Sequence, residues 1–162
     1  MDRGEGFKET CAHYGAAMYF AQVLEHELAN ALVWLEFIPD ARTQQQEKDL
    51  ESYYEVNFAK TLGRLIKSLK RVSALPEELE ASLQQAIETR NFLTHHYFRE
   101  REPQISSGRY EELIVELEAM RAELERTDHL LSALTRPIRE SYGLTDAVIQ
   151  KEVRFRTRTS PP

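Results

Sequence analysis

The spacing of apolar residues constrains this chain more than any other feature of its sequence. Apolar side chains recur at steps of three and four residues in several long stretches, which is the period of a helix that buries one face. The stretches lack the two-residue alternation typical of a half-buried strand. The pattern therefore predicts an all-α protein.

The boundaries of these stretches predict an antiparallel bundle of four main helices plus a short C-terminal helix. Proline, glycine and capping residues separate the stretches, as expected at helix ends. Gly63 lies inside the second stretch and is expected to mark a bend or a close helix contact. The four main helices are expected over about 7–37, 43–72, 76–101 and 106–137, and the short one over about 145–153.

Length and composition fit one soluble domain. With 162 residues, we expect a single helical domain over 1–162, with about 1–6 and 157–162 frayed. The net charge of −6 argues against broad electrostatic binding of nucleic acid, although a local basic site remains compatible with it. One cysteine, no signal-peptide pattern and no apolar run of membrane-spanning length lead us to expect a cytoplasmic protein without a membrane partner.

The residues that can carry chemistry gather near the end of the third predicted helix. The segment from Arg90 to Tyr97 places a guanidinium, an amide, two imidazoles and a phenol within about two helical turns. Arginine can clamp a phosphate through two hydrogen bonds, and histidine can transfer a proton near neutral pH. Together these groups suit a cleavage of RNA in which the 2′-hydroxyl attacks the neighbouring phosphate without help from a metal ion.

The sequence carries no recognisable motif for a metal or a cofactor. None of the histidines follows a glutamate at the three-residue spacing found in di-iron bundles. The cysteine–histidine spacing of a zinc site and the glycine-rich loop of a phosphate site are also missing from the sequence. We therefore expect neither a metal nor a cofactor.

Arg90, Asn91 and His95 form the pattern Arg-x4-His on a late helix of an all-α chain, which resembles the motif of the HEPN superfamily. The extension to Tyr97 is similar to the HepT-type toxins within that superfamily. The resemblance implies a metal-independent endoribonuclease of a toxin–antitoxin or anti-phage system. It implies a homodimer that cleaves RNA at a site built from the motif helices of both subunits.

The same resemblance implies a role for each motif residue. Arg90, Asn91 and His95 would be catalytic, and Tyr97 would be modified by a cognate nucleotidyltransferase antitoxin. Two alternatives stay open. His96 also satisfies an arginine–histidine spacing from Arg90, so it is an alternative or auxiliary histidine. Tyr97 falls on the apolar stripe of its helix, where a tyrosine commonly packs with its hydroxyl at the edge of the core.

A non-catalytic helical bundle that binds a partner protein or a nucleotide is the alternative function. In that case Arg90 would be a structural arginine paired with an acidic residue of another helix. The stretch Glu25-His26-Glu27 is either a solvated helix surface or a group that polarises a catalytic histidine. Convergence of Arg90 and His95 on an open cleft would favour the nuclease. A buried Arg90 locked to a carboxylate would favour the binding protein.

Overall fold

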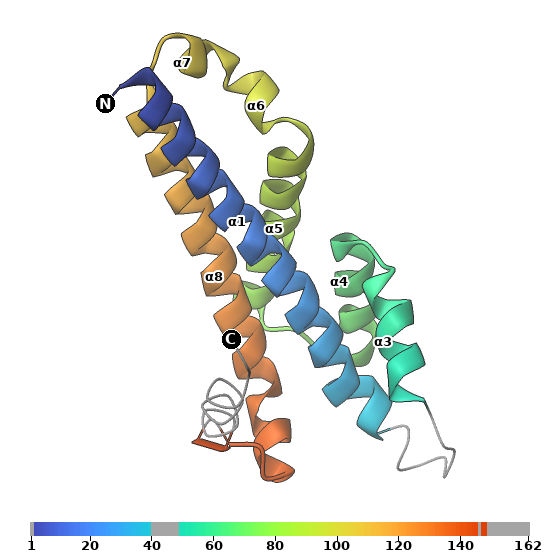
Figure 1. Ribbon diagram of the computed structural model, residues 1–162. Helices are drawn as coiled ribbons and strands as arrows, with labels where there is room; N and C mark the ends of the chain where they lie inside the picture. The colour runs from blue at the N-terminus through green and yellow to red at the C-terminus, as the bar shows by residue number, and fades with distance from the viewer. Residues whose placement is uncertain (1, 40–48, 146, 149–162) are drawn as a thin grey trace, which may run out of the picture.

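The structure is a computed structural model that describes residues 2–39, 49–145 and 147–148. Within these residues every regular element is helical, which confirms the all-α prediction (Figure 1). None of the described helices combines the length and the apolar character needed to cross a membrane.

Three of the described helices are long, and the others are short. The long helices are α1 (Arg3–Leu32), α5 (Glu77–His95) and α8 (Tyr110–Ser141). One π-helical segment, η1 (Val33–Phe37), extends α1. The short helices are α3 (Leu50–Phe58), α4 (Leu62–Val72), α6 (Tyr97–Glu100) and α7 (Glu102–Ser106).

α1 and α8 lie side by side and run in the same direction (Figure 1). The N-terminal end of α1 contacts the N-terminal end of α8, and the two C-terminal ends also meet. Gly6 lies against the ring of Tyr110, and the ring of Trp34 is 5.9 Å from that of Tyr142. α5 runs opposite to both of them. The predicted antiparallel bundle of four main helices would instead place the first and last of them antiparallel, so this part of the prediction is wrong.

The cause of this difference lies in the second predicted helix, 43–72, whose described part, 49–72, contains two helices. α3 ends at Phe58, and Thr61 has an extended backbone (φ −70°, ψ 157°) before α4 begins. The chain reverses between them, and this extra reversal brings α8 back parallel to α1 (Figure 1). Gly63 does not mark the bend. It lies in the first turn of α4, where a Cβ atom would meet Ile87 at an ordinary 3.9 Å.

The third predicted helix, 76–101, is interrupted at His96. This residue adopts φ −129° and ψ −28°, so α5 ends at His95 and α6 begins at Tyr97. A helix end leaves carbonyl groups without partners. Here the Tyr14 hydroxyl of α1 donates a hydrogen bond of 3.0 Å to the Leu93 carbonyl. Contact with α1 therefore supports the end of α5 at the motif.

The fourth helix also departs from its predicted limits. α8 begins at Tyr110 rather than at the expected serine–glycine cap, and it continues through Pro137 to Ser141. A proline inside a helix removes one backbone hydrogen bond, and its ring crowds the carbonyl four residues earlier. The side chains of Thr135 and Arg139 both donate to the Ser132 carbonyl nearby, which adds local support.

The two ends of the chain differ in what the structure describes. Residues 3–6, which were expected to fray, form the first turn of α1. Most of the short helix expected over 145–153, and the whole of 157–162 and 43–48, lie outside the described residues. Thr145 accepts a hydrogen bond of 3.4 Å from the backbone of Val148, as a capping threonine would.

The core lies where α1, α4, α5 and α8 meet, and each helix contributes a stripe of leucines. Burial of a leucine side chain contributes about 1.5–3 kcal/mol, so these stripes dominate the stability of the fold. The apolar spacing of the second predicted helix would place Phe58 in the core, and this is wrong because Phe58 is 45% exposed. The most deeply buried leucines are Leu24, Leu28, Leu32, Leu65, Leu69, Leu79, Leu83, Leu93, Leu113, Leu117, Leu124 and Leu131.

A glycine-to-alanine pair tests the contact between the starts of α1 and α8. A Cβ atom on Gly6 would lie 2.2 Å from the Tyr110 ring, whereas one on Gly15 would meet nothing within 4 Å. We expect Gly6→Ala to lower the free energy of unfolding by about 1–3 kcal/mol through overpacking. The matched Gly15→Ala should raise it by up to about 1 kcal/mol. Equal stability of the two variants in urea unfolding would contradict the packing described here.

Candidate functional site

The three predicted catalytic residues all reach the surface near the C-terminal end of α5. Arg90 is half-buried, and Asn91 and His95 are exposed. The guanidinium of Arg90 donates from Nη1 to Asn91 Oδ1 at 3.4 Å. The motif therefore presents a cation and an amide that touch each other, with an imidazole about one turn further along.

Arg90 also pairs with α1. Its Nε lies 3.4 Å from Glu25 Oε1, and the two side chains are 28% and 26% exposed. This is the pairing expected for Arg90 under the alternative, non-catalytic interpretation. Partly solvated ion pairs contribute little to stability, about 0–1 kcal/mol. The pair thus orients the guanidinium without removing it from solvent.

The neighbours of Glu25 on α1 make contacts of their own. The ring of His26 packs against that of Phe58, with centroids 4.6 Å apart. Asn30 Nδ2 donates to Glu27 at 3.4 Å, and burial raises the pKa of the Glu27 carboxyl above its usual range. Within the described residues, the contacts of these side chains do not include either motif histidine.

His95 and His96 differ in how far their rings are already engaged. His96 Nδ1 lies 2.7 Å from Arg99 Nη2 and 3.9 Å from Glu100 Oε1. In the described part of the chain, the contact found for His95 is with the ring of His96, at 6.2 Å between centroids. His95 is therefore the histidine whose ring nitrogens are available to a ligand.

Tyr97 packs in the core. Its side chain is 1% exposed, and its hydroxyl donates to the Leu113 carbonyl at 3.4 Å. Burial raises the pKa of the Tyr97 phenol above its usual range, and the nearby Glu116 carboxylate adds to that shift. A modifying enzyme would reach this hydroxyl only after α6 had moved away from α8.

An ion pair holds α6 in this place. Arg101 Nε donates to Glu116 Oε2 of α8 at 2.8 Å, and the Arg101 guanidinium lies 5.0 Å from the centre of the Phe92 ring. Phe92 in turn meets Tyr97 edge to face, with centroids 5.8 Å apart. These contacts fix the turn that follows His95, and with it the end of the motif.

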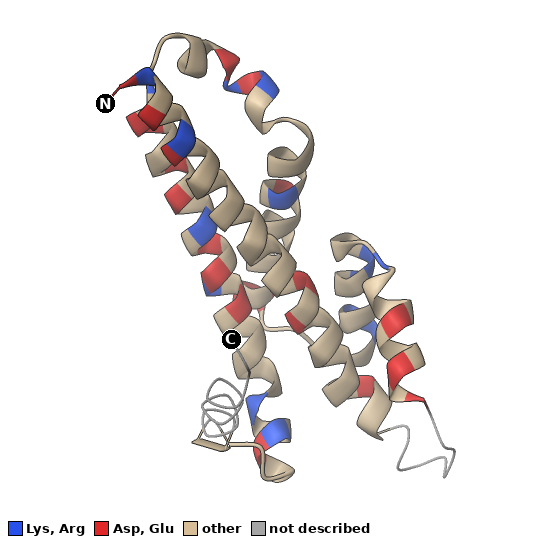
Figure 2. Cartoon of the chain, viewed as in Figure 1, with Lys and Arg blue, Asp and Glu red and all other residues tan. Residues whose placement is uncertain are grey.

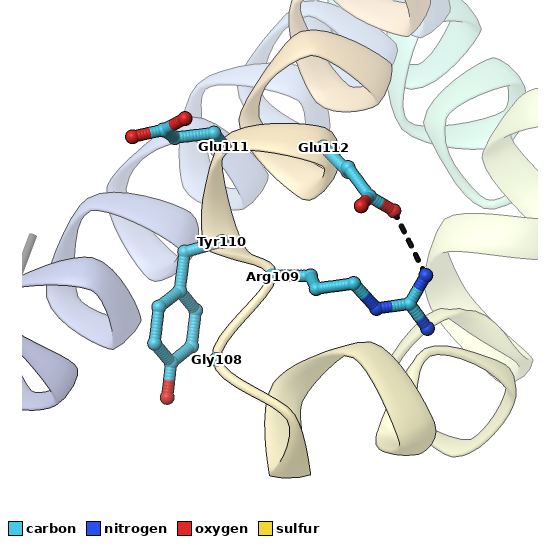
Figure 3. Close-up of a pocket in the computed structure, with 5 residues that line it drawn as sticks. All are labelled: Gly108, Arg109, Tyr110, Glu111 and Glu112. Atoms are coloured by element: carbon cyan, nitrogen blue, oxygen red, sulfur yellow. Dashed lines mark hydrogen bonds and ion pairs between the residues drawn. The ribbon is translucent and has the colours of Figure 1, made fainter.

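Helix geometry separates Arg90 from His95 within one chain. Five residues along an α-helix correspond to about 140° of rotation and about 7.5 Å of rise, so the two side chains leave α5 on different sides. A pocket of about 300 Å³ at the junction of α7 and α8 contains no motif residue (Figure 3). It is lined by residues 108–112, and two of its three charged groups, Arg109 and Glu112, pair at 3.2 Å.

A basic segment is the feature that sequence reasoning missed. Residues 56–75 contain five lysines and arginines and no aspartate or glutamate, in a chain whose net charge is −6. Four of these cations lie on α4, while the neighbouring α3 carries acidic residues (Figure 2). The run is visible in the sequence, but only the separation of α3 from α4 gathers its charges on one short helix.

Comparison with known proteins does not assign this chain to a family. No family model, no curated protein and no solved structure matches this chain. Among the described residues, no three histidine, cysteine, aspartate or glutamate side chains come together as a metal site.

The buried phenol of Tyr97 predicts a loss of stability at alkaline pH. The folded protein keeps the Tyr97 proton at pH values where the unfolded chain has released it. This stabilisation is complete below about pH 10 and is lost as the pH rises towards the pKa of the folded state. In urea unfolding from about pH 8 to pH 11, the wild type should lose more stability than Tyr97→Phe. A parallel decline in both proteins would contradict the burial of this hydroxyl.

Proposed function

We propose that this chain is a metal-independent endoribonuclease of HEPN type that acts as a homodimer in a toxin–antitoxin or anti-phage system. The observation that supports the proposal best is the arrangement at the end of α5. Arg90 and Asn91 touch each other at the surface, and His95 follows with an uncommitted ring. A cognate nucleotidyltransferase antitoxin belongs to the same proposal as a partner.

Each motif residue has a chemical role in this proposal. The Arg90 guanidinium binds the scissile phosphate and stabilises the charge that develops on its oxygens. Asn91, in contact with that guanidinium, orients it. His95 takes the proton from the attacking 2′-hydroxyl or gives one to the departing 5′-oxygen. The products are a 2′,3′-cyclic phosphate and a 5′-hydroxyl.

The angle between Arg90 and His95 supports a site that two chains share. Because the two side chains diverge by about 140° on one helix, a second α5 is the simplest way to bring an arginine and a histidine to one phosphate. A two-fold axis beside α5 would form such sites in pairs. Tyr97 contributes packing to this arrangement, and its modification by the antitoxin would require α6 to move away from α8.

A non-catalytic binding protein is the second candidate, and a specific observation favours it. Glu25 already neutralises Arg90, as expected for a structural arginine. The pair is partly solvated and involves one contact to Nε, so a phosphate can compete for the other guanidinium nitrogens. We therefore prefer the nuclease.

The two adjacent histidines provide a matched test of the proposed roles. We expect wild-type protein to cleave RNA in the presence of EDTA and to leave 2′,3′-cyclic phosphate ends. His95→Ala should lower the rate by about 10²–10⁴-fold, and Arg90→Ala by about 10²–10³-fold. His96→Ala, the control, should retain most of the activity, because its ring is engaged with Arg99.

The variants are first compared with wild type for helical content and oligomeric state. Equal loss in His95→Ala and His96→Ala would mean that the helix end, rather than one imidazole, is required. Cleavage that survives in both Arg90→Ala and His95→Ala would reject this site. A folded, dimeric wild type that cleaves none of several RNAs would favour the binding protein.

A further inference from the structure

We propose that the exposed face of α4 and the pocket beside its first turn bind the backbone and one unpaired base of a single-stranded RNA. This inference deepens the proposed function, because it names the form of RNA and the surface that holds it beside the motif. It is carried by three observations: the charge of α4, its position relative to Arg90, and the lining of the pocket.

The exposed face of α4 is uniformly basic. Arg64, Lys67 and Arg71 are exposed and, at their spacing, lie within about 60° of arc over about 10 Å of the helix. Within the described residues none of the three pairs with a carboxylate. Arg71 contacts Ser68, and only Lys70 at the side of the stripe pairs with an acid, Glu80. We call Arg64, Lys67 and Arg71 the α4 basic stripe.

The α4 basic stripe starts near the motif. α4 and α5 run in opposite directions, since the end of α4 meets the start of α5 through the pair of Lys70 and Glu80. The first turn of α4 lies beside the second half of α5, where a Cβ on Gly63 would be 3.9 Å from Ile87. Ile87 is one turn before Arg90. An RNA strand along α4 would therefore run towards the motif arginine.

A pocket of about 350 Å³ lies between these two features. It is lined by Gln22, Glu25, His26, Phe58, Lys60 and Leu65. Glu25 is also the ion-pair partner of Arg90, so one residue lines the pocket and contacts the motif. Lys60 is held at the rim by a hydrogen bond of 2.8 Å to Asn57.

The lining of the pocket suits an unpaired base. The rings of His26 and Phe58 offer aromatic surface, and Phe58 is 45% exposed although it is large and apolar. Aromatic side chains that stack on bases are the usual means of holding single-stranded nucleic acid. Gln22 and Glu25 can hydrogen-bond the edge of a base, while Lys60 and the α4 basic stripe neutralise phosphates. A duplex keeps its bases stacked inside and would not fill the pocket.

The apolar residues of α4 argue against a lipid surface as the ligand. Leu62, Leu65, Ile66 and Leu69 are buried in the core of the protein. A helix that lies on a membrane instead keeps its apolar face free to enter the lipid. The face that α4 presents to solvent is charged, which suits a polyanion in solution.

Charge reversal with a matched control tests the inference. All binding is measured in the His95→Ala background with EDTA, by fluorescence anisotropy of a labelled single-stranded RNA of mixed sequence. We expect Arg64→Glu, Lys67→Glu and Arg71→Glu together to weaken binding by at least about tenfold and to reduce the salt dependence by about two logarithmic units per decade of salt. The control reverses Lys8, Arg109 and Arg136 to glutamate, which changes the net charge equally on other exposed sites. It should bind nearly as well as the parent.

A second pair of variants tests the pocket. Phe58→Ala should weaken binding of the same RNA by roughly tenfold, as expected for the loss of one stacked base. Val56→Ala, on the same helix and 61% exposed, should have little effect. The parent should bind the single strand more tightly than the corresponding RNA duplex.

The possible results separate this inference from the proposed function. Equal weakening by the two triple variants would show an effect of net charge alone and would overturn the inference. So would an absence of RNA binding, or binding to vesicles of anionic lipid in place of RNA. If the wild type cleaves RNA and the α4 and Phe58 variants cleave it equally well, the inference is overturned and the proposed nuclease function stands. RNA binding that depends on α4, without any cleavage, would support the inference and reject the nuclease.

Discussion

Burial of the apolar face of α1 is the constraint on which the rest of the structure depends. Leu24, Leu28 and Leu32 are completely buried, because α8, α5 and α4 all pack against this helix. The contact with α8 is parallel and extends along most of both helices. α5 then has to run in the opposite direction, since only short segments join it to α8. The placement of the motif is thus a consequence of how three helices cover one apolar stripe.

The polar residues beside that stripe connect α1 to the candidate site. Tyr14 supports the end of α5 through the Leu93 carbonyl, and Glu25 orients Arg90. The same carboxylate lines the pocket at the start of α4. In this way one helix surface joins a proposed catalytic motif to a proposed binding surface. Removal of Glu25 would affect both, so it cannot distinguish between them, whereas substitutions in α4 and at His95 can.

Much of the buried surface was predictable from the sequence, because helical periodicity reports directly on burial. The breaks between α3 and α4 and between α5 and α6 were not predictable in this way. Neither residues 59–61 nor His96 carries a proline or glycine signal, and the break at His96 is held by contacts distant in sequence, such as Arg101 with Glu116. Pro137 shows the opposite case, in which a strong breaker is tolerated near a helix end. Pairing of Arg90 with an acid of another helix was one of two alternatives that the sequence left open, and only packing selects Glu25. The basic residues of α4 are visible as a run in the sequence. Their position on one exposed helix face follows only from the structure, in which α4 is separate from α3.

The central claim is that Arg90 and His95 act together on one phosphate although they diverge on one helix. The most direct test mixes Arg90→Ala and His95→Ala subunits under conditions of subunit exchange and measures RNA cleavage. Each variant alone should be nearly inactive. A random mixture contains hybrid dimers with one intact site, so we expect recovery of about a quarter of the wild-type rate. No recovery, with subunit exchange verified and wild type active, would contradict a site shared between two copies of α5.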